Sequence, residues 1–540
     1  TGGNNDGVET RLDFDNDGYL DIFVIGTSEN DAQNAAFLFH NDKSGKFYIT
    51  ENILPEDLKS GQKALTFDYN ADGDLDAVIS NPDGSVRFLR NDGGNNNHYV
   101  KMKLVGLRTG SGKNNHFGIG AKVEIRAGNL YQSKVVDSPE IHFGLGPRNQ
   151  ADIIRILWTN GVPQNMFFPG TDQNLVEEQI LKGSCPFLYA WNGEKYVFVK
   201  DIMWKSALGM PLGLMGEDKT AKYASPAASV DFIKIPGEFL EPEDNTYKFQ
   251  LTAELWETIY ADKIQLIALD HPDSVDIFVD ERFTPFSNYE YELFQVNNKR
   301  LPVSATDSDG NNQLPAISKE DDNYVSSLYS EEFQGITKLS NLTLDFGEID
   351  NSKNLRLFLN SWVFPTDASI NYSIGQSGKI KSVAPQIQAI NEKGEWETIV
   401  ENISFPMGKD KTIVVDLTGK IPTSNARIRI RTNMQIYWDH IFFSNEEIAS
   451  PVKTHNLNPS FADFHYRGFS RPFRKGGRYG PHWFDYDSVS TQQKWRDLTG
   501  NYTRYGDVLP LLMEADDMYI IYNAGDETTI EFDATELPEL

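Results

Sequence analysis

Two short acidic segments carry the residue types and the spacing of an oxygen-liganded metal site. Residues 13–21 read DFDNDGYLD and residues 68–76 read DYNADGDLD, and both fit the pattern D-x-[DN]-x-D-G-x-x-D. Calcium takes roughly six to eight oxygen ligands in a flexible shell, and alternate positions of a tight loop direct several side chains at one centre. The two segments therefore predict two calcium ions. Their role is structural, because a fully coordinated ion has no open position for chemistry.

The predicted ligands are side-chain oxygens at alternate loop positions, with one backbone carbonyl in each loop. Gly18 and Gly73 stand where each loop must turn sharply, a position that favours glycine. The ligands of the first loop are Asp13, Asp15, Asp17, the Tyr19 carbonyl and Asp21, and those of the second are Asp68, Asn70, Asp72, the Asp74 carbonyl and Asp76.

The two acidic loops could also belong to EF-hands or be simple turns without a metal ion. An EF-hand would place a Glu at the twelfth loop position and a helix on either side. The twelfth positions are Val24 and Ile79, inside stretches typical of strands, so an EF-hand is excluded. The remaining alternative is that the Asp side chains only cap turns and stay solvated. The near-identical recurrence of the loop, each time directly before a strand, favours calcium.

A second segment with binding chemistry lies near the carboxyl terminus. Residues 465–487 read HYRGFSRPFRKGGRYGPHWFDYD, the one dense basic and aromatic patch in an acidic chain. Guanidinium groups bind carboxylate or sulfate bidentately, and aromatic faces stack on sugars or on Arg. The alternative, which we favour, is an ordered loop over 466–483 that packs on the preceding domain through Arg–carboxylate pairs and aromatic stacking. The candidate ligand-binding residues are Arg467, Arg471, Arg474, Tyr479 and Trp483.

Other reactive residue types give no motif. A nucleophile elbow, a phosphate-binding loop and a dinucleotide fingerprint are all missing from the sequence. Cys185 is the single cysteine, so an internal disulfide is excluded, and its setting SCPFLYAW favours a buried apolar role. A possible transition-metal site is disfavoured, because its candidate ligands follow no tight ligand spacing. These candidates are His440, His455, His465 and His482 with Asp439, Asp463, Asp485 and Asp487.

Composition limits the class of protein. The 540 residues include 50 Lys and Arg against 78 Asp and Glu, a formal net charge of −28, which excludes general attraction to nucleic acid or to an anionic membrane. Hydrophobic residues at 39% are enough for packed cores. No apolar run approaches the roughly 18 residues of a membrane span. The chain begins TGGNNDG, which we interpret as a mature, processed or partial chain.

The elements that must position these residues are strands. Segments such as LDIFVIG, AKVEIRAG, KYVFVKD and ARIRIRT alternate with period two or are short β-branched runs, and Gly, Pro, Asn and Asp separate them. The predicted fold class is all-β. Changes in composition along the chain predict four domains, at 1–92, 93–183, 184–450 and 451–540. The third is expected to contain β-sandwiches of the jelly-roll kind, and the fourth is an Arg- and aromatic-rich β segment.

The amino-terminal region resembles a known repeat. The two acidic loops, followed by strings such as FLFHNDKSGKFYITEN, resemble the FG-GAP (VCBS) repeat of integrin-like β-propellers. The resemblance implies two blades over 1–92, each with a calcium ion in its loop. A propeller needs at least about four blades. We therefore expect the missing blades to come from the parent chain or from a partner.

The next region resembles the ASPIC/UnbV domain that follows FG-GAP repeats in the cartilage acidic protein family. The resemblance rests on Gly118-Ile119-Gly120-Ala121, His142-Phe143-Gly144-Leu145-Gly146 and Trp158-Thr159-Asn160-Gly161, with Thr159 and Asn160 where the family usually has Pro and Asp. Beyond Cys185 the chain still resembles bacterial members of this family, in the segments CPFLYAWNGEKYVFVKD and PHWFDYD. It implies binding or adhesion and transfers no catalytic residue. We expect His142 to be a packed or turn-bonding side chain.

Two classes of function remain open. The first is a secreted, cell-surface or periplasmic bacterial protein, a calcium-stabilised binding, adhesion or assembly module that recognises a carbohydrate or a protein partner. The second is a carbohydrate-active enzyme, a lyase, dehydratase or hydrolase, on the same propeller and sandwich scaffold. A pocket with two carboxylates in unequal environments, or three convergent His and Asp ligands, would indicate the enzyme. A shallow aromatic surface would indicate the binding module.

Overall fold

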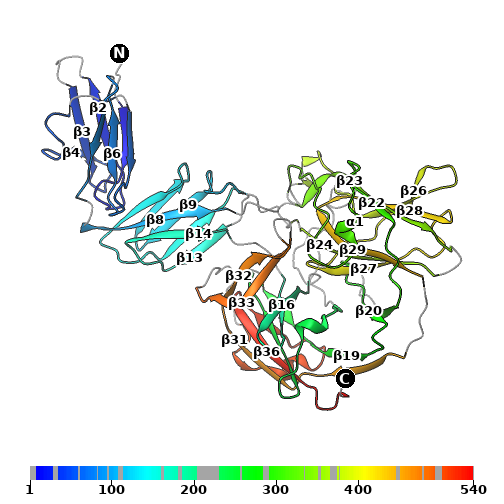
Figure 1. Ribbon diagram of the computed structural model, residues 1–540. Coiled ribbons are helices and arrows are strands. Elements are labelled where there is room, and N and C mark those ends of the chain that lie inside the picture. The colour runs from blue at the N-terminus through cyan, green and yellow to red at the C-terminus, as the bar shows by residue number, and fades with distance from the viewer. Residues whose placement is uncertain are drawn as a thin grey trace. The chain divides into compact units, whose positions relative to one another are not determined.

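The computed structural model of the protein is built almost entirely of β-strands (Figure 1). Helix in the described residues is limited to short pieces such as the four-residue α1 (Leu314–Ile317) and the 3-10 turns η3 (Gly237–Phe239) and η5 (Leu509–Leu512). The all-β prediction is confirmed. The structure describes all residues except 1–7, 28–33, 59–60, 62, 82, 94–95, 107–113, 160–162, 180–184, 204–229, 256–257, 284–290, 334, 351–353, 365, 367–373, 376, 446–450, 477–479, 493–501 and 539–540.

The chain divides into two compact units. Unit 1 comprises Thr1–Arg108 and Lys113–Ile180, and unit 2 comprises Thr109–Gly112 and Leu181–Leu540. The finer limits predicted at residues 92, 183 and 450 stay predictions. Within the described residues no helix has the length and the apolar character that a bilayer span requires.

Unit 1 begins with two antiparallel sheets, neither of which closes on itself. The acidic loops connect β1 to β2 and β5 to β6, so each loop joins the first two strands of its sheet. Leu12, Ile25 and Leu38 of the first sheet share one core with Ala77 and Ile79 of the second. The strands are β1 (Val8–Leu12), β2 (Asp21–Thr27), β3 (Asn34–Asn41) and β4 (Phe47–Ile49), then β5 (Lys63–Phe67), β6 (Asp76–Ser80) and β7 (Val86–Leu89).

The rest of unit 1 is a sandwich of two sheets, in the orders β10-β9-β12-β13 and β11-β8-β14. Strands β8 and β14 pair in parallel and the other pairs are antiparallel. Alternate residues such as Val100, Met102, Val123 and Ile125 fill the core around Trp158. The strands are β8 (His98–Val105), β9 (Lys122–Ala127), β10 (Leu130–Val135), β11 (Ile141–Gly146), β12 (Ile153–Leu157), β13 (Pro163–Phe167) and β14 (Gln173–Glu178).

One sheet of unit 2 combines strands from distant parts of the sequence. Its order is β16-β15-β17-β36-β31-β34, so strands on both sides of residue 450 pair with one another. The two-stranded pairs β18–β35 and β19–β30 accompany it. The strands are β15 (Phe187–Trp191), β16 (Tyr196–Asp201), β17 (Thr246–Thr252), β18 (Ile259–Ala261), β19 (Leu266–Asp270), β30 (Lys453–Leu457), β31 (Phe461–Tyr466), β34 (Gly506–Asp507), β35 (Ile520–Tyr522) and β36 (Asp526–Asp533).

A second pair of sheets in unit 2 encloses the largest core. The orders are β22-β23-β28-β25-β26 and β27-β24-β29, and β20 pairs with β21 beside them (Figure 1). The register of β24 against β29 shifts between Leu359 and Ser361, a bulge opposite Asp439 and His440. The strands are β20 (Asp276–Phe278), β21 (Phe294–Val296), β22 (Ser304–Thr306), β23 (Ile336–Glu348), β24 (Arg356–Val363), β25 (Gln386–Ile390), β26 (Trp396–Val400), β27 (Lys411–Asp416), β28 (Asn425–Met434) and β29 (Ile436–Ser444).

Candidate metal centre

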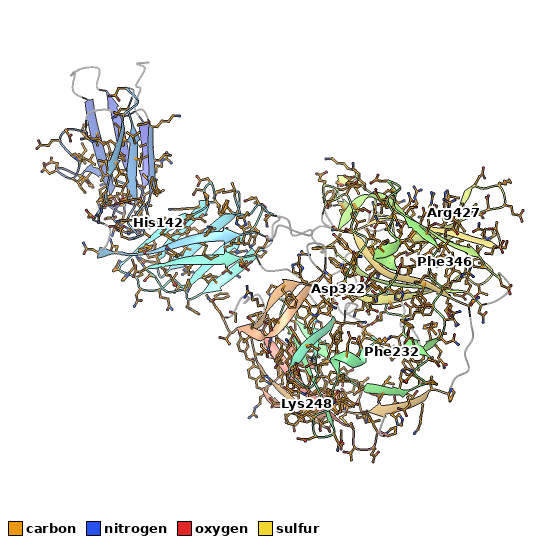
Figure 2. The ribbon with its side chains drawn as sticks, in the orientation of Figure 1. His142, Phe232, Lys248, Asp322, Phe346 and Arg427 are labelled. Carbon is orange, nitrogen blue, oxygen red and sulfur yellow. The ribbon has the colours of Figure 1, made fainter. Side chains whose placement is uncertain are left out.

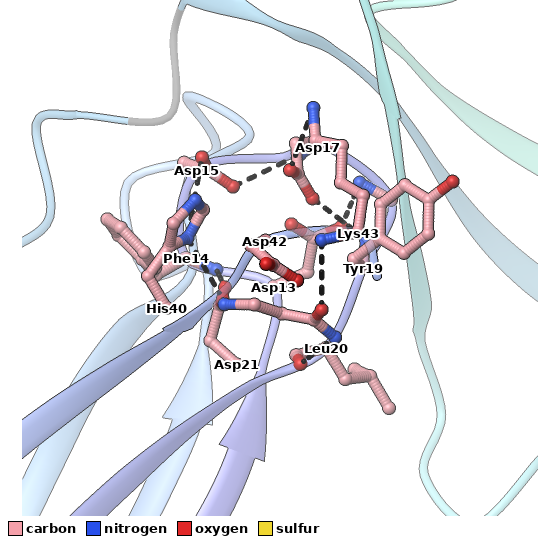
Figure 3. A network of polar contacts seen from close by, with 12 residues as sticks. Asp13, Phe14, Asp15, Asp17, Tyr19, Leu20, Asp21, His40, Asp42 and Lys43 are labelled. Carbon is pink, nitrogen blue, oxygen red and sulfur yellow. Dashed lines mark hydrogen bonds and ion pairs between the residues drawn. The ribbon is translucent and has the colours of Figure 1, made fainter. Parts of the chain in front are cut away.

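The carboxylates of the first acidic loop hold the loop closed from inside (Figure 3). Asp13 Oδ2 accepts a hydrogen bond from the Gly18 backbone N–H at 2.9 Å, and Asp17 Oδ1 accepts one from Tyr19 N–H at 2.9 Å. Asp21 Oδ2 accepts one from Phe14 N–H at 3.2 Å. Gly18 has φ +94°, a left-handed conformation that glycine adopts without strain. The loop is therefore shaped around its own acidic side chains.

The second loop repeats this scheme position by position. Asp68 Oδ2 accepts from Gly73 N–H at 2.9 Å, and Asp72 Oδ1 accepts from Asp74 N–H at 3.0 Å. Asp76 is buried and accepts from Tyr69 N–H inside the loop at 3.0 Å and from Asn91 N–H after β7 at 2.8 Å. The two segments that look alike in the sequence thus fold alike.

The first carboxylate of each loop keeps one oxygen without a hydrogen-bond partner. These atoms are Asp13 Oδ1 and Asp68 Oδ1, and both are buried. A buried carboxylate oxygen without a partner is costly, and a cation removes the cost. In the first loop, ligand atoms of Asp13, Asp15 and Asp17 also lie within 4.8 Å of one another. Hard oxygens converging in this way fit a calcium ion.

Burial and mutual repulsion raise the pKa values of carboxyl groups in the first loop, and a bound cation would lower them again. Burial, with the neighbouring charge of Asp17, raises the pKa of Asp13 to about 8. The same two causes raise the pKa of Asp15. Burial raises the pKa of Asp21 to about 6. A divalent ion among these groups would favour their charged forms.

A lysine distinguishes the second loop from the first. Lys101 on β8 is buried, and its Nζ lies 2.9 Å from Asp68 Oδ2. In the first loop the comparable cation is Lys43, which lies 3.1 Å from Asp17 Oδ2 but is exposed to solvent. Across the described residues, groups of three convergent His, Cys or carboxylate ligand atoms occur at the first loop, as Asp13, Asp15 and Asp17 and as Asp15, Asp21 and His40. The second loop, which the structure describes in full and in which Asn70 takes the place of one Asp, forms no such group. The second loop already holds one fixed positive charge.

Asn16 joins both loops to the ASPIC/UnbV-like sandwich, a role that sequence reasoning missed. Its amide Nδ2 donates to the Gly73 carbonyl at 3.0 Å and to Asp74 Oδ1 at 3.1 Å. Its Oδ1 lies 2.6 Å from Nε2 of His142 on β11. Burial lowers the pKa of His142 to about 3, so the ring is neutral and its Nε2–H donates to Asn16.

Glycines of the two regions allow their backbones to approach closely. A Cβ on Gly144 would lie 2.1 Å from Asp13 Oδ2 and 2.7 Å from the Asn16 Cα. A Cβ on Gly73 would lie 2.0 Å from the ring of Tyr99, which itself stacks on His142 with centroids 5.6 Å apart. The HFGLG segment is therefore the surface on which the first acidic loop packs.

The basic and aromatic segment of unit 2 contains a β-hairpin, so the prediction of an ordered loop over 466–483 was wrong in its secondary structure. Strand β32 (Phe469–Arg474) pairs with β33 (His482–Ser490). The aromatic run supplies enough pairing and packing to form strands, since Trp483 and Phe484 lie in one buried cluster with Phe187, Tyr189 and Phe198.

The candidate ligand-binding residues of this hairpin have different surroundings. The Arg467 side chain has 9% of its surface exposed and lies 3.1 Å from Glu254 and 3.2 Å from Glu527. Arg474 donates to the Gly480 carbonyl at 2.7 Å, and Trp483 is buried. Arg471 is exposed, and Tyr479 lies outside the described residues.

Replacing Arg467 by alanine is expected to lower the free energy of unfolding of unit 2 by about 3 kcal/mol, because two buried glutamates lose their cation. Chemical denaturation measures the change. Arg471→Ala is the matched control, and its exposed side chain should change stability by less than about 0.5 kcal/mol. Equal, small effects of both variants would contradict a structural role for Arg467.

Comparison with known families agrees with this arrangement. Residues 13–79 match the FG-GAP-like repeat, and residues 110–180 match the ASPIC and UnbV family. The chain therefore carries an FG-GAP-like repeat followed by an ASPIC/UnbV domain, as the motifs predicted. No curated protein matches the chain.

Among solved structures, one similar chain comes from work on the promiscuous specificity of carbohydrate-binding modules of the β-sandwich superfamily. It is 11% identical, and the alignment covers 71% of this chain and 98% of that chain, with a TM-score of 0.13. A similarity at this level carries no argument about fold or function.

Proposed function

We propose that the protein is a calcium-stabilised binding module of the secreted, cell-surface or periplasmic kind. The observation that supports it most is the buried, unpartnered carboxylate oxygen at the first position of both acidic loops, Asp13 Oδ1 and Asp68 Oδ1. In this proposal each loop holds one calcium ion, which joins the loop to the strands on either side. Unit 2 supplies the surface that binds a glycan or a protein partner.

In this proposal the acidic side chains of each loop bind the ion, and Asn16 positions the loops. Asp13, Asp15, Asp17 and Asp21, with the Tyr19 carbonyl, would hold the first ion. The second loop offers Asp68, Asn70, Asp72 and Asp76 with the Asp74 carbonyl. Asn16 positions both loops through the hydrogen bonds of its side chain with Gly73, Asp74 and His142. Calcium would neutralise the negative charge of the acidic side chains, and its role would be structural.

Exposed apolar side chains on the two amino-terminal sheets support the proposal of a partner. Leu65 and Val86 have 69% and 68% of their surfaces exposed, and they lie on the face of the second sheet that points away from the shared core. Contiguous exposed apolar faces mark interaction sites. We propose that further blade-like repeats, from the parent chain or from a partner, cover these faces. The exposed residues are Phe37, Phe47 and Ile49 on the first sheet and Leu65, Phe67, Val86 and Phe88 on the second.

The enzyme alternative depends on a pocket with two carboxylates in unequal environments. Burial raises the pKa of Asp439 to about 8 and that of Asp410 to about 6, so the pair is unequal. Both side chains are buried, and neither lines the cavity described below. That cavity does contain two carboxylates in unequal environments, because burial raises the pKa of Asp280 whereas, against the effect of burial, hydrogen bonds from Thr418 lower the pKa of Asp416. The carbohydrate-active enzyme therefore stays the second candidate function.

Removing calcium is expected to destabilise unit 1. An ion present at about a hundredfold above its dissociation constant stabilises the folded state by roughly 2.7 kcal/mol. Chelation should therefore lower the melting temperature of unit 1 and leave the transition of unit 2 unchanged. Calcium titration should show two unequal sites, the first loop being tighter because Lys101 partly neutralises the second. Calorimetry with and without calcium, alongside the metal content of the purified protein, measures both effects.

Variants and a second metal give the controls for this experiment. Asp17→Ala should reproduce the larger share of the chelator's effect and Asp72→Ala the smaller share, because the tighter first site contributes more to stability. Magnesium should rescue poorly, because it prefers a small and nearly octahedral shell. Unchanged melting together with an absence of bound calcium would show that the loops are only turns.

A further inference from the structure

Unit 2 contains a cavity of about 380 Å³ beside the edge strand β27. Its walls come from β27 itself, from the segment after β20, from the first residue of β24 and from Phe232. Binding sites for small molecules are concave and have volumes of about 300–1,000 Å³, with apolar walls and a few fixed polar groups. The cavity has the size of such a site, and half of its lining residues are charged.

Side chains cap the outer edge of β27 and make this wall of the cavity rigid. Glu281 donates its backbone N–H to the Thr412 carbonyl at 2.8 Å and accepts Thr412 N–H at 2.9 Å. Arg282 donates to the Val414 carbonyl, and Asp280 Oδ1 accepts from Val414 N–H at 3.4 Å. A strand edge that is already satisfied cannot add a peptide strand. The occupant of the cavity is therefore recognised by side chains.

The charged groups that line the cavity balance one another. Asp280 and Arg282 form a close pair, with Nε and Oδ2 2.6 Å apart. Arg356 lies 3.7 Å from Glu292. The third pair is Lys420 with Asp416, whose carbonyl accepts from Lys420 Nζ at 2.7 Å. Three cations beside three carboxylates leave no net charge to attract an ion, but they offer donors and acceptors side by side.

Aromatic rings complete the cavity. Phe294 is buried, and the Arg356 guanidinium lies over its ring at 5.2 Å from the centroid. Phe232, labelled in Figure 2, packs against Tyr291 with centroids 4.9 Å apart. Rings of this kind provide an apolar surface on which the C–H face of a sugar packs.

We propose that this cavity binds a neutral oligosaccharide. Each sugar hydroxyl both donates and accepts a hydrogen bond, which matches the alternating charges of the lining. An acidic ligand would have to compete with three carboxylates for the cations. The proposal rests on the proposed binding function and names its ligand class and its site.

The experiment measures binding of neutral oligosaccharides, and of uronate- or sulfate-bearing ones of the same length, to the full chain by calorimetry and saturation-transfer NMR. We expect a neutral ligand to bind and Phe232→Ala and Arg356→Ala each to raise its Kd at least tenfold. Phe461→Ala and Arg427→Ala, exposed residues of the same types elsewhere in unit 2, should leave the Kd unchanged. Melting curves of the variants check their folding.

Three results would overturn the proposal. Neutral ligand that binds equally well to both cavity variants would place the site elsewhere and leave the binding function intact. Tighter binding of acidic ligands would show that the cations prevail over the carboxylates. If no oligosaccharide binds while calcium still stabilises unit 1, the ligand class is wrong and the calcium part of the proposed function stands.

Discussion

Gly144→Ala is expected to lower the free energy of unfolding of unit 1 by about 3 kcal/mol, the range in which overpacking of a tight site falls. The added Cβ would lie 2.1 Å from Asp13 Oδ2 and 2.6 Å from the Asn16 carbonyl carbon. Gly144 does not have a left-handed backbone, so the contact alone causes the loss. Chemical denaturation of the full chain, with the unit 1 transition resolved, measures the change.

A matched glycine and a second measurement separate this contact from a general effect of alanine. Gly170, also in unit 1 and also without a left-handed φ, would place a Cβ 3.3 Å from the flexible end of Gln173. Gly170→Ala should cost less than about 1 kcal/mol. Because Gly144→Ala displaces Asp13, it should also weaken calcium binding at the first loop at least tenfold. Equal stability of the two variants would contradict the close packing of β11 on the acidic loop.

The parts of the candidate site that are local in sequence could be predicted from it. The loop ligands lie within nine-residue segments, so their spacing alone indicates that they converge, and the structure folds both segments by one hydrogen-bond scheme. The contacts of Asn16 with Gly73 and His142 span 57 and 126 residues. No local pattern encodes such distances. The packing of HFGLG on the first loop is a tertiary contact that only the folded chain shows.

The same limit applies to unit 2. Its strands could be predicted from alternating residues, but their partners could not, because β36 pairs with β17 and β31 across long stretches of sequence. The sequence after Gly468 suggested a loop because Gly and Pro interrupt it. Burial of Trp483 and Phe484 against β15 and β16 outweighs those interruptions and produces the hairpin. Cross-strand packing of this kind decides β structure more than local preference does.

Unit 2 is expected to lose stability as the pH rises from about 4 to about 8, and Asp439→Asn is expected to remove most of that loss. Burial, strengthened by the nearby charges of Asp410 and Glu320, raises the pKa of Asp439 to about 8. Its Oδ1 is buried without a hydrogen-bond partner. The second carboxyl, Asp410, has its pKa raised by burial to about 6, although Lys475 opposes the shift and Tyr324 donates to it at 2.9 Å.

The direction follows from proton binding. A carboxyl whose pKa is higher in the folded state than in the unfolded state favours folding while it is protonated, and this contribution is lost as the pH rises through the folded-state value. The window therefore runs from the unfolded value of 3.8 to about 8 for Asp439. Each tenfold change in proton affinity corresponds to about 1.4 kcal/mol. Asparagine carries no charge at any pH, so at pH 9 the variant should be more stable than the parent, by on the order of 4 kcal/mol.

Denaturation of the parent chain and of Asp439→Asn at pH 5, 7 and 9 measures the difference between their slopes. Asp487→Asn, at an exposed position on β33, controls for the removal of a negative charge from unit 2 and should follow the parent at every pH. The residual slope in Asp439→Asn should fall mainly below pH 7, where Asp410 titrates. If parent and Asp439→Asn lose stability equally between pH 7 and pH 9, Asp439 is already ionised at neutral pH and some other cation in the fold compensates its burial.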